Sequence, residues 1–468
     1  MLIKQLYTGC LSEAAYYIES DGEAAVIDPL RDIETYTNLA KERNASIRYI
    51  FETHFHADFV SGHLDLHKAT GAPIVYGPKT ETNFPIHLAK DGEIFILGKL
   101  QIEVLHTPGH TLESTCYLLK DEDGNPHAVF TGDTLFVGDV GRPDLSSGDR
   151  TKEELASIMY DSLQNKIKTL PDNVLVYPAH GPGSSCGKNL GPETTSTIGD
   201  EKKTNYALQP QSREDFIASV TRGLDTPPQY FPVNARINKE GYDSLDKILE
   251  QGLTPLSVEE FKQKMNEEGV IILDTRKATV FTQGYVPGSI SIGLEGRFAE
   301  WAGVLLPFDK RILFVAETGS EKEAVIRLAR VGFSLIIGYL DGGYDAWKNA
   351  GEISEMLIDV EADELAMDIP HDDNLVVVDV RRETEFGDGH IAGAINIPLD
   401  EISDPAQLAS FEDNQNIYIH CGTGYRSVIA ASLFKRQGIH NIRNVLGGFE
   451  KIREQKRIEI VKENSVLN

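Results

Sequence analysis

The chain has 468 residues, a length that suggests about three domains of roughly 150 residues each. Its formal net charge of -27 disfavours nucleic acid or an anionic membrane as a partner. It contains no apolar run of about 18 residues, so we expect no transmembrane helix, and the N-terminus lacks a signal-peptide pattern. Four widely spaced cysteines without a CxxC pair indicate a reducing compartment, and we expect the cytoplasm.

Up to about residue 205 the pattern of apolar residues predicts a mixed α/β domain. The elements expected there are a strand at Ala24–Pro29, helices at Ile33–Arg43 and Leu64–Thr70, and a strand pair over Phe95–Leu105. A further helix is expected at Asp215–Leu224, before an extended connector.

Metal-capable side chains follow four short apolar strands in this region. The segments are IFETHFHAD with His54, His56 and Asp58, LHTPGHT with His110, AVFTGDT with Asp133, and VLVYPAHG with His180. A single histidine after a strand is more often structural, but four such strand and loop units close together are hard to explain in that way. Loops at the strand ends of one sheet are where α/β layers usually place chemistry, so these segments predict a metal site.

The four segments resemble the metallo-β-lactamase superfamily in order and in local sequence, including its signature T-H-x-H-x-D-H. The resemblance implies an αββα sandwich. In the dinuclear hydrolases of that superfamily, the Asp and the last His of the signature hold the second metal. Here Phe59 stands in place of that last His and cannot ligate a metal, so we expect one metal ion per chain.

Within the superfamily, GDVGRPDL at Gly138–Leu145 and the YPAHG loop resemble the persulfide dioxygenase branch. That resemblance implies one Fe(II) per chain, with His54, His110 and Asp133 as its ligands. It also implies that groups orienting the ligands or the substrate are His56, Asp58 and His180. Two imidazoles and one carboxylate are typical of non-haem Fe(II) oxygenases and leave room for a sulfur substrate and O2.

Three further residues lie close to these segments in the sequence. Arg142 has a planar guanidinium that could bind a carboxylate of a thiol cofactor, or it could form a turn pair with Asp144. Cys186 lies six residues after His180 in the Gly/Ser-rich loop HGPGSSCGK, where it could carry sulfur or be inert.

The second half of the chain contains an internal repeat of constant offset. Val270–Ile292 aligns with Leu375–Ile397, so Asp274 pairs with Asp379, and 379 − 274 = 105. A spacing of that length without net insertion indicates two copies of one small α/β domain. In the first copy, Ser257–Glu260 (SVEE) predicts a capping box at the start of a helix.

In the second copy, the sequence IYIHCGTGYRS predicts a strand, a glycine-containing loop and a helix. Loop N–H groups and a helix N-terminus create the electropositive setting that a reactive thiol needs. With GHIAGAINIP and LGGF, this loop resembles the rhodanese (sulfurtransferase) family. The resemblance implies that Cys421 carries a persulfide in a loop formed by Gly422, Thr423, Gly424, Tyr425 and Arg426. A phosphatase fold with Cys-x5-Arg is related, but Cys-x4-Arg gives a smaller loop that suits sulfur better than phosphate.

The first copy departs from this pattern, because Ala316 and Glu321 align with Cys421 and Arg426. We therefore expect it to be catalytically silent. The predicted domains are a dioxygenase domain at 1–253, a silent rhodanese at 254–355 and an active rhodanese at 356–468.

These features predict an enzyme that oxidises a small persulfide with O2 to sulfite and transfers sulfur to give thiosulfate, in sulfide detoxification. The expected partners are a small persulfide, O2, and sulfite or thiosulfate, with no nucleic acid and no membrane; the chain could form a homo-oligomer. Two alternatives stay open, a zinc thioester hydrolase of the glyoxalase II type with an appended sulfurtransferase, and a non-enzymatic sulfur-carrier scaffold.

Overall fold

The computed structural model describes residues 1–145, 150–188, 190–224, 226–402, 407, 411–412 and 414–463. They form two compact units, residues 1–247 with 328–334 and residues 248–327 with 335–468. Within the described ranges, no helix is both long enough and apolar enough to cross a membrane.

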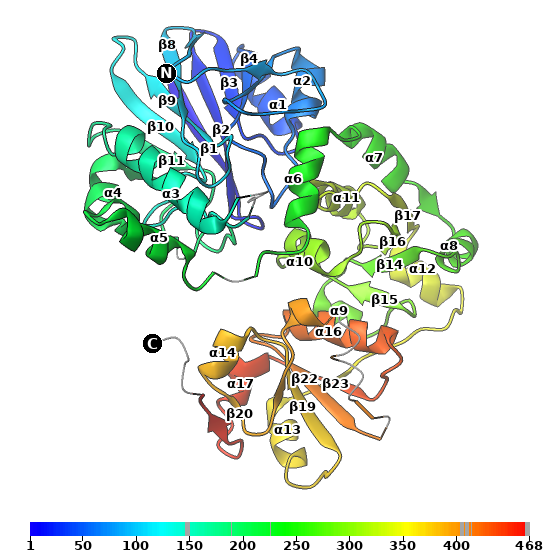
Figure 1. Ribbon diagram of the computed structural model, residues 1–468. Coiled ribbons are helices and arrows are strands. Elements are labelled where there is room, and N and C mark those ends of the chain that lie inside the picture. Colours follow the sequence, from blue (N-terminus) through cyan, green and yellow to red (C-terminus); the bar gives the residue numbers. More distant parts are fainter. Residues whose placement is uncertain are drawn as a thin grey trace. The chain divides into compact units, whose positions relative to one another are not determined.

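The first unit contains two six-stranded sheets with helices outside them (Figure 1). The first sheet is ordered β1 (Leu2–Thr8), β2 (Glu13–Ser20), β3 (Glu23–Ile27), β4 (Ser46–Glu52), β5 (Ile74–Tyr76) and β6 (His87–Leu88). The second is ordered β12 (Ser196–Thr197), β11 (Leu175–Pro178), β10 (Pro126–Gly132), β9 (Thr115–Lys120), β8 (Leu100–His106) and β7 (Ile94–Leu97). The helices of this unit are α1 (Glu34–Glu42), α2 (His63–Thr70), α3 (Lys152–Ser162), α4 (Ile198–Thr204), α5 (Arg213–Thr221) and α6 (Phe231–Glu240). The boundary between the two units falls within α7 (Leu245–Gly252).

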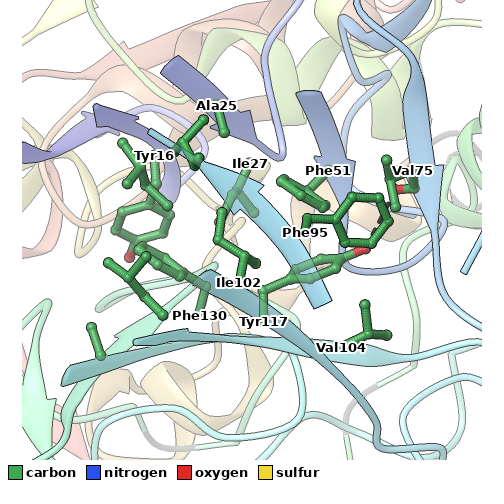
Figure 2. Close-up of a cluster of buried hydrophobic side chains, with 14 of the residues drawn as sticks. Tyr16, Ala25, Ile27, Phe51, Val75, Phe95, Ile102, Val104, Tyr117 and Phe130 are labelled. Atoms are coloured by element: carbon green, nitrogen blue, oxygen red, sulfur yellow. Dashed lines mark hydrogen bonds between the residues drawn. The ribbon is translucent and has the colours of Figure 1, made fainter. Parts of the chain in front are cut away.

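An apolar core joins the inner faces of the two sheets. Alternate residues of β2, β3 and β4 meet residues of β8, β9 and β10, and aromatic rings fill the centre (Figure 2). The outer face of the first sheet packs on Tyr36 of α1 and Leu66 of α2. The outer face of the second sheet packs on Met159 of α3 and Phe216 of α5. The unit is therefore the expected αββα sandwich.

Strand direction brings the polar segments to the sheet edges. β3 and β4 run parallel, as do β10 and β11, so within each pair the carboxyl ends lie at the same edge. β8 is antiparallel to β9, which is antiparallel to β10, so β8 also ends at the edge shared by β10 and β11. The loops after these strands carry the metal-capable residues that the sequence indicated.

The second unit contains two five-stranded sheets with equivalent strand orders. The first is ordered β13 (Pro255–Leu256), β17 (Ile336–Leu340), β16 (Arg311–Val315), β14 (Val270–Asp274) and β15 (Ser289–Ser291). The second is ordered β18 (Ile358–Val360), β23 (Ile442–Val445), β22 (Asn416–His420), β19 (Leu375–Asp379) and β21 (Ile395–Asn396), and β20 (His390–Ile391) pairs with β24 (Ile460–Val461). The helices of this half are α8 (Val258–Met265), α9 (Ala278–Phe281), α10 (Phe298–Leu305), α11 (Glu321–Arg330), α12 (Gly343–Asn349), α13 (Ala362–Asp368), α14 (Glu383–Gly387), α16 (Tyr425–Arg436) and α17 (Gly448–Ile452).

The repeat extends to side-chain contacts. Arg276 forms a bidentate pair with Asp274 and donates to the Gly284 carbonyl, and Arg381 makes the same bonds to Asp379 and Gly389. Two copies of one α/β domain are thereby confirmed.

Most predicted elements are present at the expected positions. The strand pair through Gly98 is β7 and β8, and the SVEE capping box begins α8. The helix expected at Asp215–Leu224 is α5, which starts two residues earlier and ends at Thr221. The domain limits at 253 and 355 stay predictions.

Candidate metal centre and cysteine loop

Three buried donor atoms converge in the first unit. The Nε2 atoms of His54 and His110 lie 3.8 Å and 3.5 Å from Oδ2 of Asp133. One ligand atom from each of the three residues lies within 4.8 Å of the others, and all three side chains are buried. This is the geometry of a candidate three-ligand metal site.

Hydrogen bonds fix which imidazole nitrogens are free to bind a metal. The Thr53 hydroxyl donates to Asp28, so the 2.9 Å contact between Thr53 Oγ1 and His54 Nδ1 has the imidazole as the donor. The Nδ1 atom of His110 donates to the Arg142 carbonyl at 2.8 Å. Both Nε2 atoms therefore keep a lone pair that points toward Asp133, as in protein sites that orient metal-bound histidines.

The Asp133 carboxylate presents one oxygen to the same point. Its Oδ1 atom accepts a 2.8 Å hydrogen bond from His180, whereas Oδ2 is buried and has no hydrogen-bond partner among the described residues. Burial acts to raise the pKa of Asp133, but the charge of His180 and its hydrogen bond outweigh burial and hold that pKa far below its usual value. A buried carboxylate oxygen that stays ionised and unpaired fits a cation, so the residues present fit the implied metal.

His180 lies between two carboxylates. Its Nε2 contacts Asp58 at 2.9 Å, and its Nδ1 contacts Asp133 at 2.8 Å. Burial acts to lower the pKa of His180, but Asp133 and Asp58 raise it well above its usual value. A protonated ring with both N–H groups engaged offers no lone pair to a second metal. Phe59, which stands where the signature has its last His, offers no ligand atom either, and its ring stacks on His56 at a centroid distance of 4.3 Å.

His56 turns away from the three donors. Its Nε2 lies 3.1 Å from Asp28 and 3.6 Å from Glu52, and Asp28 also accepts from the Thr53 backbone N–H. Asp28 adopts a left-handed backbone conformation (φ 50°), which aims its carboxylate at this loop. Asp28 and Glu52 are not among the site residues that the sequence predicted. The signal that could have found them is an acidic residue at the end of an apolar strand, as for Glu52, or directly after one, as for Asp28.

Asn238 of α6 contacts the loop between β4 and α2, which carries the candidate ligand His54, and was not predicted. Its amide nitrogen donates to the His56 and Phe59 carbonyls, both at 2.8 Å, and its oxygen accepts from the Ser61 N–H at 2.9 Å. Nothing in the sequence relates this residue to a loop about 180 positions earlier, because the contact depends on the tertiary fold.

Arg142 and Cys186 both lie beside the three donors. The Arg142 guanidinium is buried and forms a bidentate pair with Asp144 at 2.8 Å and 3.0 Å, which is the turn pair weighed above. Cys186 is 2% exposed rather than open on its loop, and its sulfur belongs to a second cluster with Asp58 and His180. Burial, then Asp58 and Asp133, raise the pKa of Cys186 well above its usual value, so the thiol is protonated.

The Cys421 loop in the second unit surrounds one sulfur atom. Cys421 directly follows β22 and is buried, and the Gly424 N–H donates to its sulfur at 3.1 Å. The backbone carbonyl of Cys421 accepts from the Phe449 N–H at 2.7 Å. Gly448 has a left-handed backbone (φ 57°), and a Cβ there would lie 2.4 Å from the Cys421 carbonyl oxygen, so the close approach needs glycine.

The cation of this loop is paired. Arg426 forms a bidentate salt bridge with Glu385 at 2.6 Å and 2.8 Å. The hydrogen bonds that Arg426 donates to Glu385 raise the pKa of Arg426. An anion that enters the loop therefore meets a guanidinium that is already oriented by a carboxylate.

Family comparisons agree with the division of the chain into a sandwich and two repeated α/β domains. The Metallo-beta-lactamase superfamily matches residues 8–180, and the Rhodanese-like domain matches residues 257–350 and 361–455. The chain therefore belongs to the metallo-β-lactamase superfamily and carries two rhodanese-like domains.

Curated relatives of two kinds are similar to this chain. A probable hydroxyacylglutathione hydrolase of Schizosaccharomyces pombe is 34% identical to this chain, and the match covers 37% of this chain and 66% of that relative. A second one, glo2 from the same yeast, is 33% identical over 43% of this chain and 84% of the relative. The persulfide dioxygenase ETHE1 of Mus musculus is 31% identical over 46% of this chain and 78% of the relative.

Among solved structures, a metallo-beta-lactamase from Staphylococcus aureus is 34% identical, with a TM-score of 0.64. The match covers 73% of this chain and 98% of the other. It therefore extends beyond the sandwich into the second half of the chain.

Proposed function

We propose that the first unit is a non-haem Fe(II) persulfide dioxygenase and that Cys421 performs sulfur transfer. The observation that carries the proposed dioxygenase activity is a set of two imidazole nitrogens and one carboxylate oxygen that converge on one point. The overall reaction is RSSH + O2 + H2O → RSH + H2SO3. The outer sulfur loses four electrons, which O2 accepts, and the iron, when bound, supplies the chemistry that lets O2 react.

The residues of the chain orient the site and hold its protons. Thr53 and the Arg142 carbonyl fix the tautomers of His54 and His110. The His180 ring, whose pKa is raised by Asp133 and Asp58, offsets negative charge between these two carboxylates when it is protonated.

The second reaction uses the sulfite that the first one releases. A persulfide on Cys421 would transfer its outer sulfur by Cys–S–S⁻ + SO3²⁻ → Cys–S⁻ + S2O3²⁻. The sulfur–sulfur bond to Cys421 breaks as the bond to sulfite forms, and the Gly424 N–H stabilises the departing thiolate. The pair of reactions would serve sulfide detoxification. The four cysteines are free, which suits a reducing compartment such as the cytoplasm.

The second candidate for the first unit is a zinc thioester hydrolase of the glyoxalase II type. Two relatives named as hydroxyacylglutathione hydrolases favour it, because their identity to this chain is as high as that of the dioxygenase.

An oxygen-electrode assay separates the two candidates. We expect the anaerobically purified, iron-loaded chain to consume O2 with glutathione or coenzyme A persulfide and to release sulfite. Two tightly bound zinc ions per chain, hydrolysis of a hydroxyacylglutathione thioester and no O2 uptake would establish the hydrolase instead.

A further inference from the structure

Helix α16 links the Cys421 loop to the silent copy, within the second unit. It starts at Tyr425, the residue that follows Gly424 in the loop. Farther along, the Ser432 hydroxyl accepts from the Ser291 N–H at 3.0 Å, and Arg436 donates to the Gly288 carbonyl at 2.9 Å. One helix therefore carries both the end of the sulfur-binding loop and the contacts with the other copy.

Tyr425 itself projects into the silent copy. Its hydroxyl donates to the Gly293 carbonyl at 2.8 Å. Its ring occupies the space that Gly296 leaves, since a Cβ at that glycine would lie 2.3 Å from Cζ and 2.6 Å from both Cε atoms of the ring. Burial, then Glu295, raise the pKa of Tyr425 well above its usual value, so the phenol remains a donor.

The residues on either side of Tyr425 both belong to the sulfur site. The Gly424 N–H binds the Cys421 sulfur, and Arg426 is paired with Glu385. The backbone of a residue between two such groups cannot move without moving both of them. A fixed phenol therefore fixes the direction of the N–H and of the guanidinium.

This arrangement is not a remnant of the repeat. Subtracting the offset, 425 − 105 = 320, gives Ser320 in the silent copy. Adding it, 293 + 105 = 398 and 296 + 105 = 401, gives Pro398 and Glu401 in the active copy. The tyrosine stands only in the copy with the cysteine, and the two glycines stand only in the copy without it.

We propose that the silent copy holds the Cys421 loop in its sulfur-binding conformation, through a seat for Tyr425 formed by Gly293 and Gly296. The proposal rests on sulfur transfer at Cys421 as its function. Tyr425 is here a positioning residue, and the silent copy acts on a reaction that it cannot itself perform.

The test uses the full-length chain with Gly296→Ala, Tyr425→Phe and, as a matched control, Arg436→Ala, which removes an inter-copy bond at the far end of α16. Tyr425→Phe keeps the ring and removes one hydrogen bond, so we expect kcat for sulfur transfer from thiosulfate to fall about 2- to 10-fold with little change in Tm. Gly296→Ala, in the other copy, should lower both kcat and the rate at which iodoacetamide alkylates Cys421 by about 10-fold. Arg436→Ala should change neither rate.

A double-mutant cycle separates positioning from general instability. In a Tyr425→Ala background, Gly296→Ala should have no further effect on alkylation, because the ring with which it clashes is gone. The proposal would be overturned if Arg436→Ala lowered kcat and the Cys421 alkylation rate as much as Gly296→Ala does. Unchanged Cys421 alkylation in Gly296→Ala would overturn it as well. If the unmodified chain transfers no sulfur, the proposed function fails, while the alkylation rates, followed by peptide mass spectrometry, still decide whether the seat positions Cys421.

Discussion

His54 and His56 are two positions apart and both buried, yet their rings have different surroundings. His54 is oriented by Thr53 so that its Nε2 is directed toward Asp133, whereas His56 contacts Asp28. Burial and the neighbouring His56 lower the pKa of His54 well below its usual value, so its ring is neutral, as a ligand must be.

We expect the unaltered chain to bind one iron ion and His54→Ala to lose it. His56→Ala should retain iron at about half occupancy or more, because this substitution removes only a group that orients the ligands. Metal analysis of anaerobically purified protein measures this difference. Equal loss in both variants would show that His56 is itself a ligand, and two tightly bound zinc ions in the unaltered chain would contradict a single site.

The Arg426–Glu385 pair gives a pH-dependent prediction. Burial acts to raise the pKa of Glu385, but the hydrogen bond from Arg426 outweighs it and lowers that pKa from its ordinary value of 4.5. Because the folded-state pKa is the lower one, the pair stabilises the fold above the unfolded pKa and loses this effect as the pH falls through the folded pKa.

We therefore expect Glu385→Gln to lower the Tm near neutral pH. The Tm difference from the unaltered chain should vanish in acid, as the pH falls below 4.5 and through the folded-state pKa of Glu385. Thermal unfolding across this range measures it. The control is Glu383→Gln, which alters an exposed residue of the same helix and should have little effect at any pH. A Tm difference for Glu385→Gln that persists unchanged in acid would show that the charge pair is not its source.

At the scale of elements, α6 covers the loop between β4 and α2, which carries the candidate ligand His54. Asn238 makes three hydrogen bonds to that loop, whereas the buried amide of Asn234, on the same helix, makes none to other described residues. The two asparagines are thus a matched pair, equal in chemistry and burial and different in contacts.

Asn238→Ala should destabilise the first unit by about 2–4 kcal/mol, because it leaves buried backbone groups unpaired, and should weaken metal binding. Asn234→Ala should leave metal affinity unchanged. Chemical denaturation and a competitive metal titration measure both effects, and equal metal loss in the two variants would assign the effect to helix packing rather than to the loop.

The sequence could predict those parts of the site that local pattern determines. His110 and Asp133 follow apolar strands, and the loop after β22 carries a cysteine among glycines, so their segments are recognisable without a structure. Asn238, the burial of Cys186 and the seat for Tyr425 could not be predicted, because each depends on contact between segments far apart in the chain.

At the scale of the whole molecule, the two proposed reactions use separate sets of residues in separate units. Cys421→Ser should therefore abolish sulfur transfer from thiosulfate and leave O2 consumption with a small persulfide unchanged. Parallel assays of a folded variant measure both activities. Loss of O2 uptake as well would mean that sulfur must pass through Cys421 before it is oxidised.

The first rhodanese-like copy, expected to be silent, lacks more than a nucleophile. Ala316 and Glu321 stand where the active copy has Cys421 and Arg426, and since 385 − 105 = 280, Val280 stands where the active copy has Glu385. Both partners of the ion pair are therefore missing, although the backbone is kept: Gly343, equivalent to Gly448, would bring a Cβ within 2.8 Å of the Ala316 carbonyl oxygen.

We expect Ala316→Cys in a Cys421→Ser background to show no sulfur transfer. The carboxylates of Glu317 and Glu321 would disfavour a thiolate at position 316 and repel an anionic substrate. Glu321 also accepts a hydrogen bond from the Gly319 N–H at 2.8 Å, which directs its charge into the loop. Transfer should return in part when Glu321→Arg is added, and further with Val280→Glu, which would orient the new guanidinium. Thiosulfate assays of the three variants test this order, and transfer restored by the thiol alone would show that the first copy is silent only because it lacks a nucleophile.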